Sequence, residues 1–157
     1  MKLITKQGYD KLMEELRFLH EVKLPQVMAE ALEDRENNTA KVSEDADDGE
    51  ANIVSVEQQL TETRISELEA LKNDIQIINA NQIDTKTVSF GCKIKVLMVE
   101  SVERTFMIAS SYESDVANGI ISIESPLAKE CIGLSVGDYA DVNDHEYEIL
   151  DIQNGLV

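Results

Sequence analysis

The feature that most constrains the fold is an acidic segment placed between two long helical patterns. Five of the seven residues 44–50 are Asp or Glu. Carboxylates at this density repel one another and build no core, so folding alone does not explain them. Such a segment is often a solvated turn. It can also bind a divalent cation or enter a positively charged cavity of another molecule. The sequence on either side of the segment helps to decide between these possibilities.

On both sides of the acidic segment, apolar residues recur every three or four positions, which predicts amphipathic helices. Thr5 is a suitable N-cap for the first helix, and Pro25 predicts a kink within it. Two helices of about 35 residues joined by an acidic, Gly-containing turn predict an antiparallel coiled-coil hairpin roughly 50 Å long. The first stripe contains Tyr9, Leu12, Leu16, Leu19, Val22, Val27 and Ala31; the second contains Ile53, Val56, Leu60, Leu68, Leu71, Ile75 and Ile78.

The sequence changes character after a short polar linker at residues 79–84. Short runs of β-type residues follow at 88–98, 104–109, 119–124, 139–142 and 147–152. Between them, Ser125 as N-cap and Pro126 in the first turn predict a short helix that Gly133 ends. We therefore expect an α+β chain with two domains, a helical one at 1–79 and a small α+β one at 80–157.

Composition excludes several classes of function. The net charge of −17 gives no basic face in bulk for a free-standing nucleic-acid binder, and it favours a basic protein partner. Aromatic residues are 4% of the chain and Trp is absent, so an aromatic-lined ligand pocket is not expected.

The N-terminus has no signal pattern and no apolar run approaches a membrane span, so we expect a cytoplasmic protein without a membrane partner. We expect Cys92 and Cys131 to be reduced and to serve as small packing residues.

The C-terminal half carries the most specific pattern. It consists, in this order, of residues 88–96 (VSFGCKIKV), 112–115 (YESD), 121–128 (ISIESPLA), 132–133 (IG) and 136–138 (VGD). This series resembles the C-terminal domain of the bacterial Gre factors, GreA and GreB. Residues 16–19 (LRFL) with Pro25 resemble the first helix of that family, and residues 59–65 (QLTETRI) resemble its second helix. The resemblance covers nearly the whole chain.

The resemblance implies a coiled-coil finger followed by a domain of FK506-binding-protein-like (FKBP-like) fold. It implies RNA polymerase as the partner, with the globular domain at the rim of the secondary channel and the finger inside it. Two carboxylates at the tip would help hold the second catalytic Mg²⁺ of the polymerase, which then cleaves backtracked RNA. The factor would be no enzyme itself. It would have no cofactor of its own, only indirect contact with nascent RNA, and no small-molecule substrate.

The resemblance also assigns residues. Counting back from Arg64 without gaps places the two tip acids, as catalytic and magnesium-holding residues, on Glu44 and Asp47. Asp45 and Asp48 are the fallback pair if the register slips by one. The expected docking segment is 122–138, with the candidate residues Ser122, Ser125, Pro126, Gly133, Gly137 and Asp138, although the same residues can simply shape turns.

The tip departs from the family pattern, so other functions stay open. The first arm is several residues longer than usual, and Asp48 stands where the family has Asn. Residues 30–50 contain nine acids against Arg35 and Lys41. A tip this negative repels RNA phosphates, and it resembles an inhibitory branch of the family that occludes the channel or chelates the metal. A peptidyl-prolyl isomerase and a plain coiled-coil adaptor are further alternatives. A calcium-binding EF-hand loop is disfavoured because no Glu stands at its twelfth position.

Overall fold

A computed structural model of the chain describes the backbone of residues 1–39 and 49–157 and the side chains of residues 1–33 and 56–157. The described chain is α+β, which confirms the predicted class. It divides into two compact units: unit 1 is Met1–Tyr9 with Ile75–Val157, and unit 2 is Asp10–Asp74. Unit 1 therefore includes both the start of the chain, Met1–Tyr9, and the segment Ile75–Ile78 at the end of the predicted second stripe. The predicted division at residues 79 and 80 had placed both of these in the helical domain.

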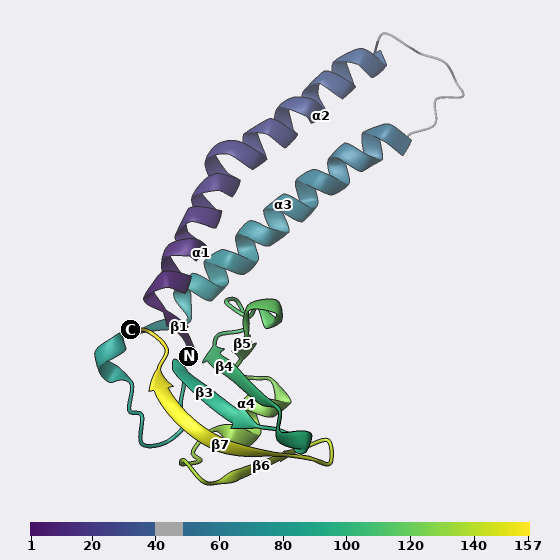
Figure 1. Cartoon of the computed structure of the whole chain (residues 1–157). Helices are drawn as coiled ribbons and strands as arrows, with labels where there is room; N and C mark the ends of the chain where they lie inside the picture. Colours follow the sequence, from purple (N-terminus) through teal and green to yellow (C-terminus); the bar gives the residue numbers. More distant parts are fainter. Residues whose placement is uncertain (40–48) are drawn as a thin grey trace. The chain divides into compact units, whose positions relative to one another are not determined.

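Unit 2 consists of two helical arms (Figure 1). The first arm contains α1 (Lys6–Phe18), whose first turn belongs to unit 1, the π-helical turn η1 (Leu19–Lys23) and α2 (Leu24–Thr39); the second arm is α3 (Gly49–Asn73). α2 and α3 pack against each other. Burying one face of each arm removes apolar surface from water, which is the main force that holds the pair together. The buried seam contains Leu12, Leu16, Val27, Thr61, Ile65 and Leu68.

The kink predicted at Pro25 corresponds to a local change of helix type. The π turn η1 directly precedes α2, and the Leu24 N–H donates to the Leu19 carbonyl five residues back. Proline has no N–H to donate, and its ring crowds the carbonyl four residues earlier. A wider turn at this point relieves that crowding while the helical path continues.

The second helical stripe ends earlier than predicted. α3 ends at Asn73, and Ile75–Ile78 form strand β2, so the assignment of Ile75 and Ile78 to the helix is wrong. β2 pairs in parallel with β1 (Lys2–Thr5), with Lys2 opposite Ile75 and Thr5 opposite Ile78. Spacing could not reveal this pair, because a four-residue apolar run fits a helix or a strand equally well.

The rest of unit 1 is a five-stranded sheet in the order β5-β4-β3-β7-β6. All neighbouring strands are antiparallel except β4 and β5. The elements are η2 (Ala80–Gln82), β3 (Cys92–Leu97), η3 (Val99–Ser101), β4 (Glu103–Ala109), η4 (Val116–Asn118), β5 (Ile120–Ser122), α4 (Pro126–Cys131), β6 (Tyr139–Val142) and β7 (His145–Asn154). Four predicted strands thus exist with small changes in their bounds. The run at 88–98 contracts to β3, and Val88 and Phe90 are buried outside it.

The core of unit 1 covers one face of the sheet. Ile94 and Val96 of β3 and Ile108 of β4 are fully buried there, together with Ala128 and Cys131 of α4. Ile149 and Ile152 of β7 are three residues apart, yet both join this core because the register between β3 and β7 shifts at Lys95/Val96. A bulge of this kind changes which face a residue occupies, so strict alternation fails along β7.

Candidate functional site

The predicted tip acids lie outside the described residues. This applies to Glu44 and Asp47 and to the fallback pair Asp45 and Asp48. Within the described part of the chain, no group of three or more His, Cys, Asp or Glu side chains is arranged to hold a metal ion. The assignment of Mg²⁺ to Glu44 and Asp47 therefore stays a prediction, and the structure describes the arms on either side of them.

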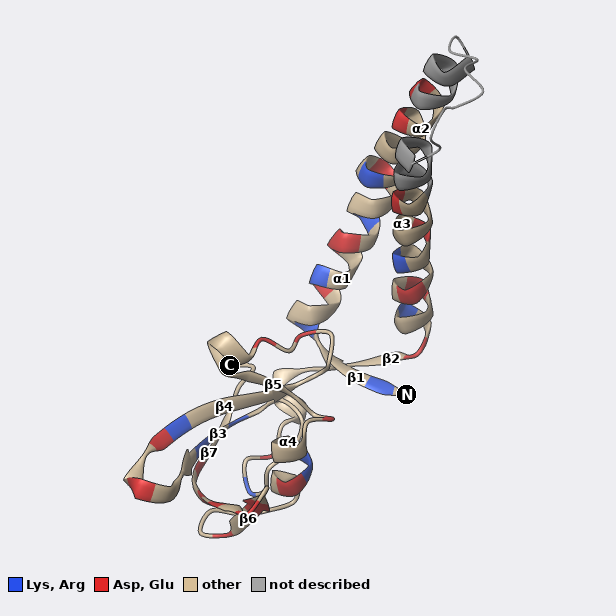
Figure 2. Cartoon of the chain, turned by 90° about the vertical axis from the view of Figure 1, so that its right-hand side faces the viewer, with Lys and Arg blue, Asp and Glu red and all other residues tan. Residues whose placement is uncertain are grey.

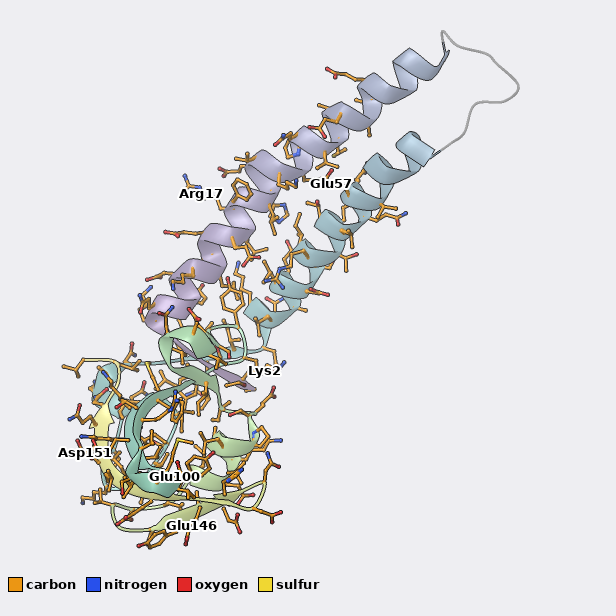
Figure 3. The ribbon with its side chains drawn as sticks, turned by 45° about the vertical axis from the view of Figure 1, so that its right-hand side comes forward. Lys2, Arg17, Glu57, Glu100, Glu146 and Asp151 are labelled. Carbon is orange, nitrogen blue, oxygen red and sulfur yellow. The ribbon has the colours of Figure 1, made fainter. Side chains whose placement is uncertain are left out.

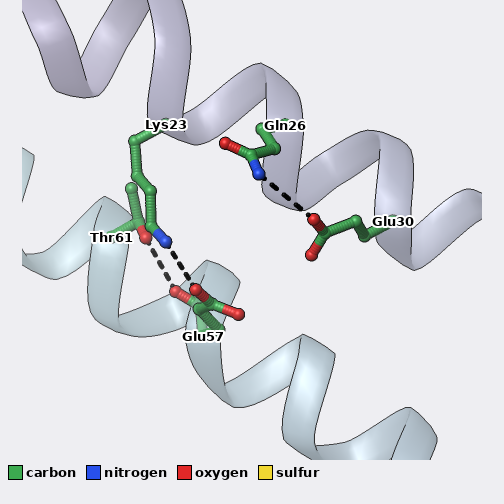
Figure 4. A network of polar contacts seen from close by, with 5 residues as sticks. All are labelled: Lys23, Gln26, Glu30, Glu57 and Thr61. Carbon is green, nitrogen blue, oxygen red and sulfur yellow. Dashed lines mark hydrogen bonds and ion pairs between the residues drawn. The ribbon is translucent and has the colours of Figure 1, made fainter.

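An ion pair joins the two arms below the tip. Lys23 Nζ lies 2.6 Å from Glu57 Oε1, and the Thr61 hydroxyl donates to the Glu57 carbonyl at 2.8 Å (Figure 4). The hydrogen bond to Glu57, followed by the negative charge of Glu57, raises the pKa of Lys23 above its ordinary 10.5. Figure 3 shows Glu57 between the arms and Arg17 on the outer side. The positive charge of Lys23 on the first arm is thus paired with the negative charge of Glu57 on the second arm.

Two further polar contacts cross between the arms. Arg64 Nε lies 2.9 Å from Glu15 Oε1, and His20 Nε2 lies 3.1 Å from Glu69 Oε1. Charged residues of both signs alternate along the arms (Figure 2). Exposed pairs of this kind add little stability each. Their placement on facing helices favours one register of the arms over others.

Three of the six docking candidates build the start of α4. The Ser122 hydroxyl lies 2.7 Å from the Ser111 hydroxyl and accepts from the Glu124 N–H at 3.1 Å. The Ser125 hydroxyl accepts from the Ala128 N–H at 3.3 Å, and Pro126 is the first residue of the helix. The predicted N-cap and first turn are confirmed. These side chains therefore stabilise the loop before α4 and the first turn of that helix.

The other three candidates shape the turn after α4. Gly133 and Gly137 have φ values of +87° and +93°, a region that favours glycine because L side chains are strained there. Asp138 Oδ2 accepts from the Ser135 N–H at 2.8 Å. Together the six residues support the turn-shaping alternative at least as well as direct contact with a partner. Whether they dock a partner stays a prediction.

Exposed apolar side chains within this segment and directly after it were missed at the sequence level. Ile132, Val136 and Tyr139 are 39%, 57% and 57% exposed. They stand directly beside Gly133, Gly137 and Asp138 in the chain. The signal available in the sequence was this interleaving of apolar residues with turn residues, since a turn brings its side chains to the surface. Tyr is among the residue types that most often carry the contact energy of a protein interface.

The open face of the sheet has a hollow of about 590 Å³. Its lining mixes apolar residues with charged and amide side chains, which include Lys93, Lys95, Asn118, Asp151 and Gln153, and Phe106 is its single aromatic residue. A prolyl isomerase needs an apolar pocket with aromatic walls to hold a proline side chain. This hollow does not provide one, which argues against the isomerase alternative at this face.

Both cysteines are free and buried, as expected for packing residues. Cys92 Sγ lies 3.3 Å from Ser89 Oγ. Burial, with a smaller contribution from the charge of Glu130, raises the pKa of the Cys131 thiol to about 11. A thiol kept protonated and away from solvent is a poor nucleophile, so we expect Cys131 to react slowly at neutral pH.

Comparison with protein families identifies both parts of the chain. Residues 2–77 match the family described as "Transcription elongation factor, N-terminal". Residues 83–154 match the family described as "Transcription elongation factor, GreA/GreB, C-term". The two matches follow one another with a gap of a few residues between β2 and β3. None of the described helices combines the length and the apolar character that crossing a bilayer requires.

Individual proteins agree with the family matches. The chain is 37% identical over 158 residues to the transcription elongation factor GreA of Chelativorans sp. (strain BNC1), which covers 97% of each protein. It is 34% identical over 154 residues to GreA of Helicobacter acinonychis (strain Sheeba), which covers 95% of this chain and 91% of the relative. Among solved structures, GreA factor homolog 1 of Thermus thermophilus is 23% identical, covers 97% of this chain and 98% of its own, and superimposes with a TM-score of 0.43.

Proposed function

The chain belongs to the GreA/GreB family of transcription elongation factors, and on that premise we propose that it binds RNA polymerase at the secondary channel and stimulates cleavage of backtracked nascent RNA. The observation that carries this proposal is the presence of both family parts in one chain, at residues 2–77 and 83–154. A protein with this role works in the cytoplasm. It acts as an accessory factor, since the cleavage chemistry belongs to the polymerase.

The finer architecture belongs to the same proposal. The two arms would form an antiparallel coiled-coil finger, which the shared seam and the Lys23–Glu57 pair support. Unit 1 would be an FKBP-like domain, which the sheet with α4 packed on one face supports. Each arm would then bring one end of the acidic segment 44–50 to the far end of the finger.

The tip acids would act as oxygen ligands. Carboxylates suit Mg²⁺, which is commonly held by one or two of them together with phosphate and water. A second metal ion in the polymerase supplies charge stabilisation for the attacking and leaving oxygens. In this chain Glu44 and Asp47 would bind and orient that ion. They stand three residues apart in the sequence, so on a helical turn they would face the same way.

Docking would fall to residues 122–138 of unit 1, together with the adjoining Tyr139. The exposed Ile132, Val136 and Tyr139 would provide apolar contact, and Asp138 with the other acids of this segment would favour a basic partner surface. Ser122, Ser125, Pro126, Gly133 and Gly137 would then act by holding the loop in shape.

A second candidate function rests on the charge of the tip. Residues 30–50 carry nine acids and two bases, so the tip would repel the phosphates of RNA. A factor with such a tip could enter the channel and inhibit the polymerase by occluding it or by chelating its metal. Both candidates require binding to RNA polymerase and differ only in the effect of the bound factor on the transcript.

One experiment separates the candidates. Backtracked RNA polymerase complexes with labelled transcripts are incubated with the wild-type protein and with Glu44→Ala/Asp47→Ala. Cleavage that rises with the wild-type protein and collapses in the variant supports the cleavage factor and its site. Binding with slowed elongation and no cleavage moves the protein to the inhibitory alternative. If it does not bind polymerase at all, both candidates fail.

A further inference from the structure

A single carboxylate in unit 1 collects hydrogen bonds from two distant parts of the chain. Glu113 follows β4, in a loop that leads to η4. Its Oε2 accepts from the Ser110 hydroxyl at 2.7 Å and from the Ser110 N–H at 3.3 Å. The same oxygen accepts from the Thr5 N–H at 3.3 Å, and Oε1 accepts from the Thr5 hydroxyl. The side chain thus joins its own loop to residues more than a hundred positions earlier.

Thr5 passes this connection on to the first turn of α1. Its hydroxyl oxygen accepts from the Gly8 N–H at 3.0 Å, which is the N-cap bond predicted from the sequence. The hydroxyl is therefore used twice, as donor to Glu113 and as acceptor from Gly8. Thr5 is only 3% exposed, so water does not compete for either bond. The negative charge of Glu113 also stands beside a helix N-terminus, where the helix dipole favours an anion.

Because Gly8 has no side chain, the Glu113 carboxylate can occupy the space beside it. A Cβ added at Gly8 would overlap the carboxylate of Glu113 and would come within 2.6 Å of its Cγ. Glycine is a poor helix former, and the backbone here has no left-handed conformation that would require it. Close approach of the Glu113 side chain explains why a glycine stands in the first turn of α1.

The location of this contact matters for the helical arms. Unit 2 is connected to unit 1 at two points, Tyr9–Asp10 and Asp74–Ile75. The β1–β2 pairing ties the two connecting segments to each other. Glu113 ties the first of them to the loop after β4. Both ends of unit 2 therefore emerge from segments that are hydrogen-bonded within unit 1.

We propose that Glu113 is a positioning residue, which anchors Thr5 and the first turn of α1 on unit 1 so that a docked factor presents its arms productively. The positioning role rests on the proposed function, whereas the anchor rests only on the hydrogen bonds of Glu113. Glu113 would touch neither RNA nor metal. Its effect would pass through the start of α1, where a small misplacement at one end of a long arm becomes a large one at the other.

Amide hydrogen exchange, measured by NMR on the full chain, tests the anchor. In Glu113→Ala, the Thr5 and Gly8 amides should exchange about tenfold faster or more, while amides of β3 and β7 stay within about twofold. Glu113→Gln keeps the size of the side chain and should give a smaller increase. In the wild-type background, Gly8→Ala should speed hydrogen exchange at the same amides. In Glu113→Ala it should have little effect on exchange, because the side chain that the new Cβ would overlap is gone. Unchanged exchange in Glu113→Ala, or equal effects of Gly8→Ala in both backgrounds, would overturn the anchor.

Transcript cleavage, titrated with factor, tests the positioning role. Glu113→Ala should leave the half-saturating concentration within about twofold and lower the maximal rate about tenfold or more. A general loss of folded protein would shift the half-saturating concentration instead. If Glu113→Ala has faster amide exchange but a maximal cleavage rate equal to that of wild type, the positioning role is overturned. If the wild-type protein binds polymerase without cleaving, the proposed function fails separately, and the exchange rates still support or overturn the anchor.

Discussion

Lys23 Nζ lies 2.6 Å from Glu57 Oε1, and this contact joins the π-helical turn of the first arm to α3. Lys23 lies in the chain between Leu16 and Val27, which are both buried in the seam between the arms. A charged residue at a seam position commonly specifies register at some expense in stability. The pair is therefore suited to favour the register in which Lys23 faces Glu57.

The first prediction concerns the raised pKa of Lys23. Because the folded state binds this proton more tightly than the unfolded state, the contribution of Lys23 to the free energy of unfolding is fully present below pH 10.5. It is lost as pH rises past that value and through the higher folded pKa. Thermal melting between pH 8 and pH 12 should show a steeper alkaline loss in wild type than in Glu57→Gln, which keeps the shape of the side chain. Parallel curves would contradict the pair.

The second prediction concerns the Cys131 thiol. Its pKa of about 11, against an ordinary 9.0, means that stability falls as pH rises from about 9 to about 11, because only the unfolded state readily loses the proton. Native protein at pH 8 should leave Cys131 unmodified by iodoacetamide, and protein in urea should be alkylated fully. Peptide mapping distinguishes it from Cys92. Rapid native alkylation of Cys131 would show that the thiol is accessible.

The third prediction separates capping from docking at Ser125. Ser125→Ala removes the acceptor for the Ala128 N–H and should lower stability by about 1 kcal/mol. Ser125→Asp keeps an N-cap acceptor and should restore stability. If the residue only shapes the loop, Ser125→Asp should also bind RNA polymerase like wild type. Weak binding by a stable Ser125→Asp protein would instead indicate direct contact with the partner.

The fourth prediction concerns the β6–β7 turn. Asn143 and Asp144 have φ values of 51° and 64°, as in a type I′ turn, where Asn-Gly is the favoured pair. Asp144→Gly should therefore raise the free energy of unfolding by several tenths of a kcal/mol, and Asp144→Val should lower it by about 1–3 kcal/mol. Urea denaturation of both variants measures the effects. A stabilising Asp144→Val would contradict the left-handed conformation.

The fifth prediction concerns the register of the acidic tip. If the ungapped count is correct, Glu44→Ala/Asp47→Ala should reduce cleavage by about a hundredfold, whereas Asp45→Ala/Asp48→Ala should reduce it far less, because only one pair faces the metal. The two variants remove the same charge and so act as controls for each other. The reverse order would assign the site to Asp45 and Asp48, and equal small effects would assign it to neither.

Local chemistry made much of the fold predictable. The start of α4 depends on Ser125 and Pro126, which act on backbone groups within three residues of themselves. Gly133 and Gly137 act through their own φ angles, and β6 follows from alternation over four residues. Thr5 was identified as an N-cap for the same reason. Each of these depends on neighbours in the chain, so the sequence pattern contains the information.

Three features that sequence patterns did not reveal involve partners that are distant in the chain. Ile75–Ile78 is a strand only because Lys2–Thr5 pairs with it from more than seventy residues away. Ile149 and Ile152 share one face because of a register shift against β3. Glu113 belongs to the YESD motif at residues 112–115, but nothing near it in the sequence indicates that Thr5 and Gly8 surround its carboxylate.

The sequence by itself determined the α+β class, the helical arms and the family, because these depend on periodicity, capping and residue order. Only the tertiary structure decided that both connecting segments of unit 2 belong to unit 1, that Lys23 faces Glu57, and that one carboxylate anchors the start of α1. The physical reason is that pairing between distant strands and hydrogen bonding between distant side chains have no local period. They appear once the chain has brought those groups together.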